Sequence, residues 1–247
     1  MPINEPYPSY SKQFDAAVGE FWEIRRRQGS KQSSGGNADA GTRGNVTGGK
    51  HLEPLADLIC SVFEDNGFNR STIATGRKAT LPGYYREQKD WDVVVLHGET
   101  VVAVVELKSQ SKSFGNNLNN RIEEAVGQTS DFWMAHKHNL IPGLRPWFGY
   151  LMLVEDHPKS RKSVKPSSSL IPKDPAFAGA SYLERYATAF ERLVVERQLD
   201  AVCFAATGEN SAGADFPTPA MTFDHFAGMI SDRCRQIINT MGPPPGE

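Results

Sequence analysis

Apolar residues recur every three or four positions in five stretches of the chain, the spacing that places them on one face of a helix. The clearest stripe lies in residues 52–66 and is followed by Gly67, a residue that often ends helices. Its members are Leu55, Leu58, Ile59, Val62 and Phe63. The pattern predicts helices over residues 9–28, 52–66, 116–137, 181–198 and 222–241.

Valine-rich runs without helical spacing predict buried strands. Two of them, residues 93–95 and 100–108, are joined by the turn-like His97-Gly98-Glu99 and predict a hairpin. Apolar runs at 147–154 and 201–206 predict two further strands, whereas residues 70–85 indicate only a short strand and a loop. Because these strands alternate with the helices, we expect an α/β fold with a mixed β-sheet flanked by helices.

The predicted hairpin carries charged residues at its ends. Asp92 precedes the first run, and the second run ends in Glu106-Leu107-Lys108. Charges are rarely buried without a partner or a metal. Two carboxylates can hold Mg²⁺, which prefers oxygen ligands, and the Leu107 carbonyl is a further donor. A metal there would activate a water against a phosphodiester, and Lys108 would orient or deprotonate that water.

Strand geometry makes this arrangement plausible. Glu106 and Lys108 are two apart and share a strand face, while Leu107 points into the core. Asp90 competes with Asp92, because both would lie on one strand face; we prefer Asp92, which abuts the apolar run. In an ordinary hairpin the same charges would simply be solvated. Their positions and the polar helix start that follows favour a metal-dependent nuclease.

The helix expected at 116–137 begins with four asparagines and an arginine, more than capping requires. Asparagine pairs with adenine edges, and arginine with guanine edges or phosphate. We predict a DNA-binding set, of which at least one member touches DNA: Asn116, Asn117, Asn119, Asn120 and Arg121. Farther along, Gln128 lies either near the metal site or at the surface. Glu53, on the first turn of an earlier helix, is interpreted first as a partner of the helix dipole.

Composition is that of a globular protein: 247 residues, 39% hydrophobic and 23% charged. We expect a single nuclease domain over residues 1–247, with a flexible Gly/Ser/Asn-rich segment at about 29–50. The net charge of −2 argues against a coating-type nucleic-acid binder, but not against a sequence-specific enzyme. Two basic clusters, Arg25-Arg26-Arg27 and residues 159–165, either contact phosphates or are solvated.

No run approaches the ~20 apolar residues that span a bilayer, and the first residues lack the pattern of a signal peptide. The three cysteines, Cys60, Cys203 and Cys234, are widely spaced and odd in number. We expect them to be reduced core thiols of a cytoplasmic protein.

Asp92, fourteen positions before Glu106-Leu107-Lys108, resembles the PD-(D/E)xK nuclease signature, with Trp91 in the proline position. The segments 89–92, 106–110 and 114–128 look like those of the XhoI-type type II restriction endonucleases. That resemblance implies a restriction-endonuclease-like fold. It also implies a protein of the bacterial cytoplasm. It also implies a homodimer that uses Mg²⁺ to cut double-stranded DNA at the palindrome CTCGAG, leaving 5′-phosphate ends. A cognate DNA methyltransferase would act on the same site.

Two other hypotheses about the function remain open. A repair or recombination nuclease of the same fold would act on DNA ends or branches; the chain shows no ATPase or helicase signature, which favours a self-contained enzyme. A non-catalytic DNA-binding module would retain the fold without the chemistry. The intact set of Asp92, Glu106 and Lys108 argues against it.

Overall fold

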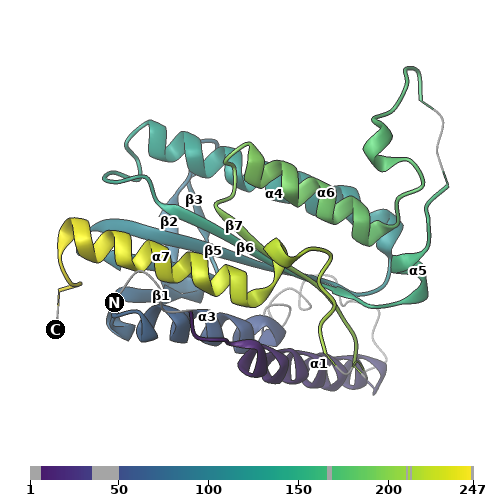
Figure 1. Ribbon diagram of the computed structural model, residues 1–247, viewed down its shortest axis with the longest axis horizontal. Coiled ribbons are helices and arrows are strands. Elements are labelled where there is room, and N and C mark those ends of the chain that lie inside the picture. Colours follow the sequence, from purple (N-terminus) through teal and green to yellow (C-terminus); the bar gives the residue numbers. More distant parts are fainter. Residues whose placement is uncertain (1–6, 35–49, 166–168, 210, 212, 246–247) are drawn as a thin grey trace.

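The computed structural model describes residues 7–34, 50–165, 169–209, 211 and 213–245, and its centre is a five-stranded sheet (Figure 1). The spatial order is β1, β4, β5, β6, β7. The first three strands pair antiparallel and the last three parallel, so the sheet is mixed, as predicted. The hairpin of β4 and β5 is confirmed, with Gly98 at a φ of 59° in its turn. The bounds are Ile73–Thr75, Val93–His97, Thr100–Gln110, Trp147–Glu155 and Ala201–Thr207.

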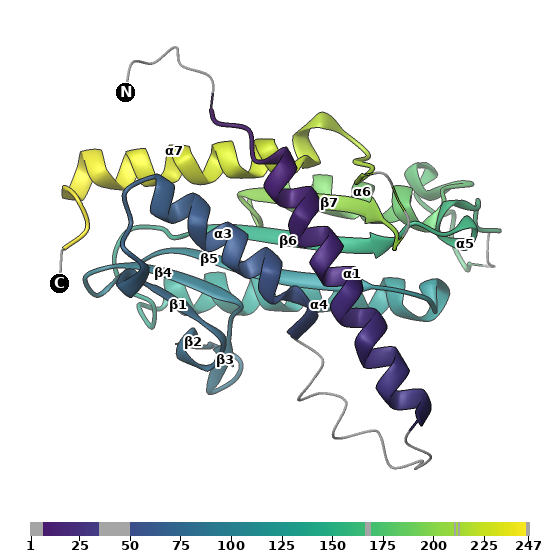
Figure 2. The ribbon, with the colours of Figure 1, turned by 90° about the horizontal axis from the view of Figure 1, so that it is seen from below.

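Helices cover both faces of this sheet (Figures 1 and 2). One face carries α1 (Ser11–Ser34), α3 (Glu53–Asp65) and α7 (Phe223–Met241), and the other carries α4 (Phe114–Lys137) and α6 (Tyr182–Val195). Each layer buries its own apolar cluster against the sheet. The α/β architecture predicted from the sequence is therefore confirmed, and it is consistent with a restriction-endonuclease-like fold.

Helical turns lie at the edges of two polar segments of the chain. The segment expected to be flexible from residue 29 begins as helix, because α1 continues to Ser34; residues 35–49 lie outside the described residues, and Lys50–Leu52 form a 3₁₀ turn. The basic cluster at residues 159–165 begins within a short helix, α5 (Pro158–Arg161). The remaining 3₁₀ turns are Arg70–Thr72, Gly76–Lys78, Pro175–Phe177 and Pro219–Met221.

A small second sheet was not predicted. It consists of β2 (Thr80–Pro82) and β3 (Gln88–Asp90), which pair antiparallel. The Trp91 N–H donates to the carbonyl of Ala79 at 2.9 Å, so pairing continues on this sheet before β4 begins at Val93. The expectation that Asp90 and Asp92 lie on one strand was therefore wrong.

The starts of α1 and α7 meet on one face of the large sheet (Figure 2). The Asp224 carboxylate, in the first turn of α7, accepts bonds from the backbone N–H of Tyr10 at 2.7 Å and the hydroxyl of Ser11 at 2.8 Å. The Ser9 hydroxyl donates to it at 2.9 Å. These bonds fix the start of α1 against the start of α7.

All three cysteines lie in the described part of the chain and are buried free thiols, as predicted. Among the described helices, none is long and apolar enough to cross a membrane.

Candidate active site

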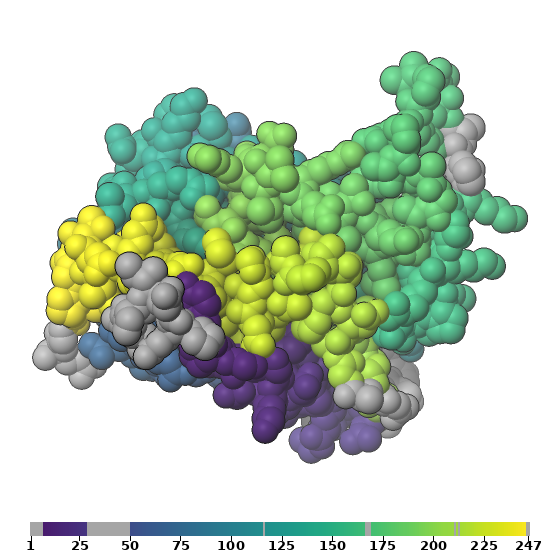
Figure 3. Space-filling model, in the orientation of Figure 1, coloured from purple at the N-terminus to yellow at the C-terminus, as the bar shows by residue number. Residues whose placement is uncertain are grey.

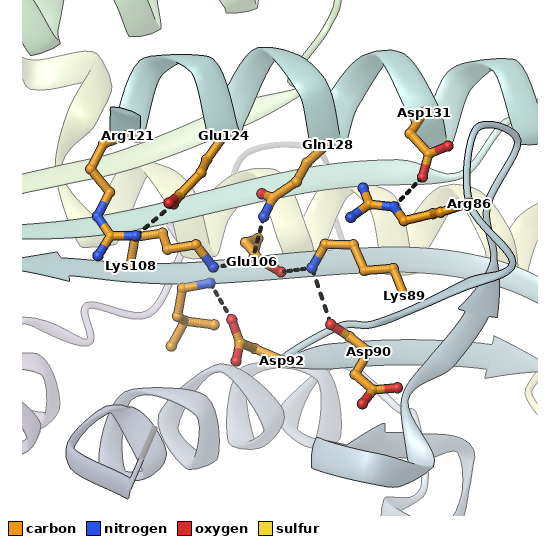
Figure 4. A network of polar contacts seen from close by, with 11 residues as sticks. Arg86, Lys89, Asp90, Asp92, Glu106, Lys108, Arg121, Glu124, Gln128 and Asp131 are labelled. Carbon is orange, nitrogen blue, oxygen red and sulfur yellow. Dashed lines mark hydrogen bonds and ion pairs between the residues drawn. The ribbon is translucent and has the colours of Figure 1, made fainter. Parts of the chain in front are cut away.

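Strand β5 sends adjacent residues to opposite faces of the sheet. Leu107 is 1% exposed and belongs to the apolar cluster of α1, α3 and α7. Glu106 is 2% exposed, and its carboxylate lies on the α4 side, where Gln128 contacts it (Figure 4). Lys108 contacts the same carboxylate. The predicted division of the three residues between two faces is confirmed.

Three side chains hold the Glu106 carboxylate. Lys108 Nζ donates to Oε1, and Gln128 Nε2 donates to the same oxygen at 3.1 Å. Lys89 Nζ donates to Oε2 at 2.8 Å (Figure 4). A buried carboxylate is costly unless it is paired, and two cations with an amide make this one tolerable.

Asp92 lies beside this group. Its Oδ2 accepts a bond from the backbone N–H of Leu107 at 2.7 Å. Burial and, second to it, the nearby Glu106 carboxylate raise the pKa of Asp92 to about 6, although Lys108, the Leu107 N–H and Lys89 act to lower it. Two neighbouring carboxylates in a largely buried place are an arrangement that a cation would relieve.

Asp92 and Leu107 line an open cavity of about 500 Å³. Glu53 and Asp57 of α3 also line it, as do Lys50 and Arg77. Glu53 therefore faces the same cavity as Asp92. No cluster of three or more His, Cys, Asp or Glu side chains close enough to hold a metal ion occurs within the described residues.

Lys89 was missed by the sequence analysis. Its side chain is 10% exposed, and Nζ lies 4.1 Å from the centre of the Trp91 ring. Burial lowers the pKa of Lys89, while Glu106 opposes that effect. A lysine in a polar three-residue strand carries no sequence signal of burial; only the folding of β3 over the site creates it.

The structure bears on the choice between Asp90 and Asp92 and on the place of Gln128. Asp90 accepts a bond from the Thr80 hydroxyl at 2.6 Å and is exposed on the small sheet, whereas Asp92 is next to Glu106. Gln128 lies at the Glu106 carboxylate rather than at the surface, and its Oε1 is buried without a hydrogen-bond partner among the described residues.

The predicted DNA-binding residues lie on the first turns of α4, one end of the same helix that carries Gln128. Asn119 and Asn120 are exposed and Asn117 is half-buried. Arg121 pairs with Glu124 at 2.5 Å (Figure 4). The side chain of Asn116 lies outside the described residues. Ser113, not an asparagine, is the N-cap of α4, and its side chain makes no capping bond.

Arg25, from the first basic cluster, points inward rather than toward solvent. It approaches Ser109, two residues after Leu107, at 3.4 Å, and also contacts Ser111. His51 contacts the Ser109 hydroxyl at 2.9 Å, and burial lowers the pKa of His51 to about 4, so its ring is neutral at pH 7. This network fastens α1 to the end of β5.

Comparison with known proteins gives consistent matches. Residues 31–218 match the family described as restriction endonuclease XhoI. Type II restriction enzyme BstVI of Geobacillus stearothermophilus is 42% identical over 181 residues, 70% of this chain and 80% of that enzyme. Type II restriction enzyme XhoI of Xanthomonas vasicola is 38% identical over 191 residues, 76% of each chain. Type II restriction enzyme AbrI of Azospirillum brasilense is 38% identical over 156 residues, 62% of this chain and 70% of that enzyme.

No solved structure matches the chain significantly. The residues matched by the family include the whole polar group around Glu106, from Lys89 to Gln128, but exclude most of α1 and all of α7.

Proposed function

We propose, because this chain belongs to the XhoI family of restriction endonucleases, that it hydrolyses double-stranded DNA at the palindrome CTCGAG with Mg²⁺. It is a type II site-specific deoxyribonuclease. The target sequence rests on the family resemblance. The observation that carries the chemistry is the buried Glu106 carboxylate, held by two lysines beside Asp92.

The residues fit a hard divalent cation. Asp92 and Glu106 supply carboxylate oxygens, the Leu107 carbonyl is a third donor, and water would complete the shell, as is usual for Mg²⁺. The raised pKa of Asp92 beside Glu106 means that an added cation would be favourable there. Gln128 Oε1, close to Glu106, is a buried oxygen without a hydrogen-bond partner among the described residues. A bound Mg²⁺ would lower the pKa of the attacking water and offset charge on the phosphate.

The side chains then have separate roles. Lys108 orients the attacking water or offsets the charge that develops on the phosphate. The Leu107 N–H fixes the orientation of Asp92, and Lys89 and Gln128 fix Glu106 from two sides. Water forms the new bond to phosphorus while the bond to the 3′ oxygen breaks and that oxygen takes a proton. One displacement inverts phosphorus and leaves a 5′-phosphate.

The proposal extends to partners. A palindromic target is matched by two-fold protein symmetry, so a homodimer would place one active site on each strand. Asn116, Asn117, Asn119, Asn120 and Arg121 would contact the DNA from the start of α4. The chain would act as a single nuclease domain in a bacterial cytoplasm, beside a methyltransferase that modifies the same site.

The test is incubation of the purified protein with a plasmid that carries one CTCGAG site, with Mg²⁺ and separately with EDTA. A single Mg²⁺-dependent linear product, absent when the site is mutated, is expected. Cleavage elsewhere would keep the nuclease and discard the target. Absence of cleavage with any divalent metal would favour a DNA-binding module.

Variants at the two competing acids locate the site. Asp92→Ala should lose at least ~100-fold in cleavage rate, since it removes a proposed metal ligand. Asp90→Ala is the matched control and should cleave at nearly the normal rate. If Asp92→Ala cleaves normally, the site assignment fails.

A further inference from the structure

A second, larger cavity of about 800 Å³ opens beyond the carboxyl ends of β5 and β6. The turn before α4, the end of β6 and the segment after α5 surround it. That segment stands out from the body of the molecule at one end of the sheet (Figures 1 and 3). Four lysines line the cavity: Lys112, Lys159, Lys162 and Lys165.

The charge of this lysine cavity is strongly positive. Glu155 is the one carboxylate among its lining residues, and its Oε2 accepts a bond from the backbone N–H of Lys112 at 3.0 Å. None of the four lysines forms an ion pair with another residue in the described part of the chain. Four positive charges thus face one negative charge.

Arg161 differs from these lysines, because its charge is neutralised by ion pairs. It belongs to the same basic run, but it pairs with Asp156 at 2.5 Å and with Asp215 at 2.6 Å. It does not line the lysine cavity. The run therefore divides into one arginine that fastens the turn and three lysines whose charges remain available.

The turn that presents these lysines is well anchored. Ser160 is fully buried, and its hydroxyl donates to the carbonyl of Glu155 at 2.9 Å. His157 accepts a bond from the backbone N–H of Lys159 at 3.0 Å. Because the backbone is held, the lysines do not need to be ordered from a free loop when an anion binds.

The aromatic side chains that line the cavity are packed against one another. Phe114 is 4% exposed, and its ring packs between His157 at 5.9 Å and Tyr182 at 6.2 Å. At Gly115 an added Cβ would lie 2.9 Å from the Tyr182 hydroxyl, so the wall is already close-packed there. Because these rings pack against each other, the lysines are the charged lining groups that remain to bind an anionic ligand.

The lysine cavity lies close to the proposed site of cleavage. Lys112 is four residues after Lys108, so the Cα atoms of the two residues lie at most about 14 Å apart. One strand of DNA rises about 3.4 Å per nucleotide, so this maximum separation of Lys108 and Lys112 corresponds to about four nucleotides.

We propose that the lysine cavity binds backbone phosphates of the DNA substrate within a few nucleotides of the cleaved bond. This proposal rests on the proposed function, since it takes DNA to be the substrate. It adds a contact set, Lys112, Lys159, Lys162 and Lys165, on a different segment from the start of α4. Such contacts position DNA without reading its sequence.

The test is DNA binding by the full-length double variant Lys159→Gln/Lys162→Gln. Its matched control is Lys12→Gln/Lys137→Gln, which removes two charges from exposed lysines on α1 and at the far end of α4. Anisotropy of a labelled CTCGAG duplex is measured in EDTA over a series of salt concentrations. The first variant should lower the slope of log affinity against log salt by about 1 per lysine, equally for a duplex without the site. The control should match the wild type.

The outcomes separate the two proposals. If the variant binds with the wild-type salt slope, the lysine cavity does not hold DNA, even when the protein cleaves CTCGAG normally. If the slope falls only for the variant, the cavity is supported, whether or not the plasmid is cut at the proposed target. A fall in both the variant and the control would overturn the proposal, because it would reflect overall charge rather than this place.

Discussion

The two faces of β5 treat neighbouring residues in opposite ways. On the α3 side, Leu107 packs in a cluster of aliphatic and aromatic side chains. On the α4 side, Glu106 is equally buried but is surrounded by Lys89, Lys108 and Gln128. Burying a leucine stabilises a protein by about 1.5–3 kcal/mol. Burying an ion pair often contributes little net stability. One face therefore holds the strand in place, and the other carries the charged group that we propose as the metal site.

The sharpest test of this contrast removes the charge of Glu106 without changing its shape. Glu106→Gln should lower the cleavage rate by at least ~100-fold, because the proposed ligand loses its negative charge. The rate is measured on the single-site plasmid at saturating Mg²⁺, and circular dichroism checks that the fold is retained. Glu123→Gln changes an exposed carboxylate on α4 and should cleave like the wild type. Comparable rates for the two variants would contradict the proposed role.

The opposite variant tests the apolar face. Leu107→Ala should lower the free energy of unfolding by about 2 kcal/mol, near the lower end for such truncations. We expect the lower end because Leu107 borders the 500 Å³ cavity, where water can enter. Urea unfolding measures the change. A loss of cleavage that exceeds the loss of folded protein would show that the two faces are not separable.

Replacing Lys89 tests whether it contributes as much to cleavage as Lys108, the other lysine at Glu106. Lys89→Met keeps an apolar stem over Trp91 but removes the ammonium from Glu106. We expect about a tenfold effect, seen as more Mg²⁺ needed for half-maximal rate, since Lys89 positions the carboxylate. A titration of rate against Mg²⁺ separates this from a change in maximal rate. An unchanged titration would mean that Lys89 only fills space.

The smallest effect is expected at Tyr150, on the same polar face. Its hydroxyl is buried without a hydrogen-bond partner among the described residues, and burial and Glu106 raise its pKa. Tyr150→Phe removes an unsatisfied group and should stabilise the protein by about 1 kcal/mol or less, with cleavage unchanged. Thermal unfolding in EDTA measures it. Destabilisation would reveal a partner for this hydroxyl and extend the polar group.

The strand alternation was predictable because it is local. A two-residue period is enough to put Glu106 and Lys108 on one face and Leu107 on the other, and the valine runs located the hairpin. The helices followed from their apolar spacing for the same reason. None of these inferences needed knowledge of distant contacts.

What escaped prediction depends on tertiary packing. Lys89 is buried only because a three-residue strand folds back over the site. The position of Gln128 depends on how α4 is rotated against the sheet. In the basic run at 159–165, Arg161 is paired with the nearby Asp156 but also with Asp215, more than fifty residues away. Such pairings leave no periodic trace in the sequence.

The hydrogen bonds between the start of α1 and the start of α7 have a consequence for protein synthesis. A ribosome-bound chain acquires Asp92, Glu106 and Lys108 long before α7 emerges, but until then one wall of its core is missing. Bonds from Ser9, Tyr10 and Ser11 also wait for Asp224. Since domains fold as units, the core of the nuclease would not become complete before α7 is made. A chain that stopped before α7 would leave exposed the apolar sheet surface against which Phe226, Ile230 and Ile237 pack.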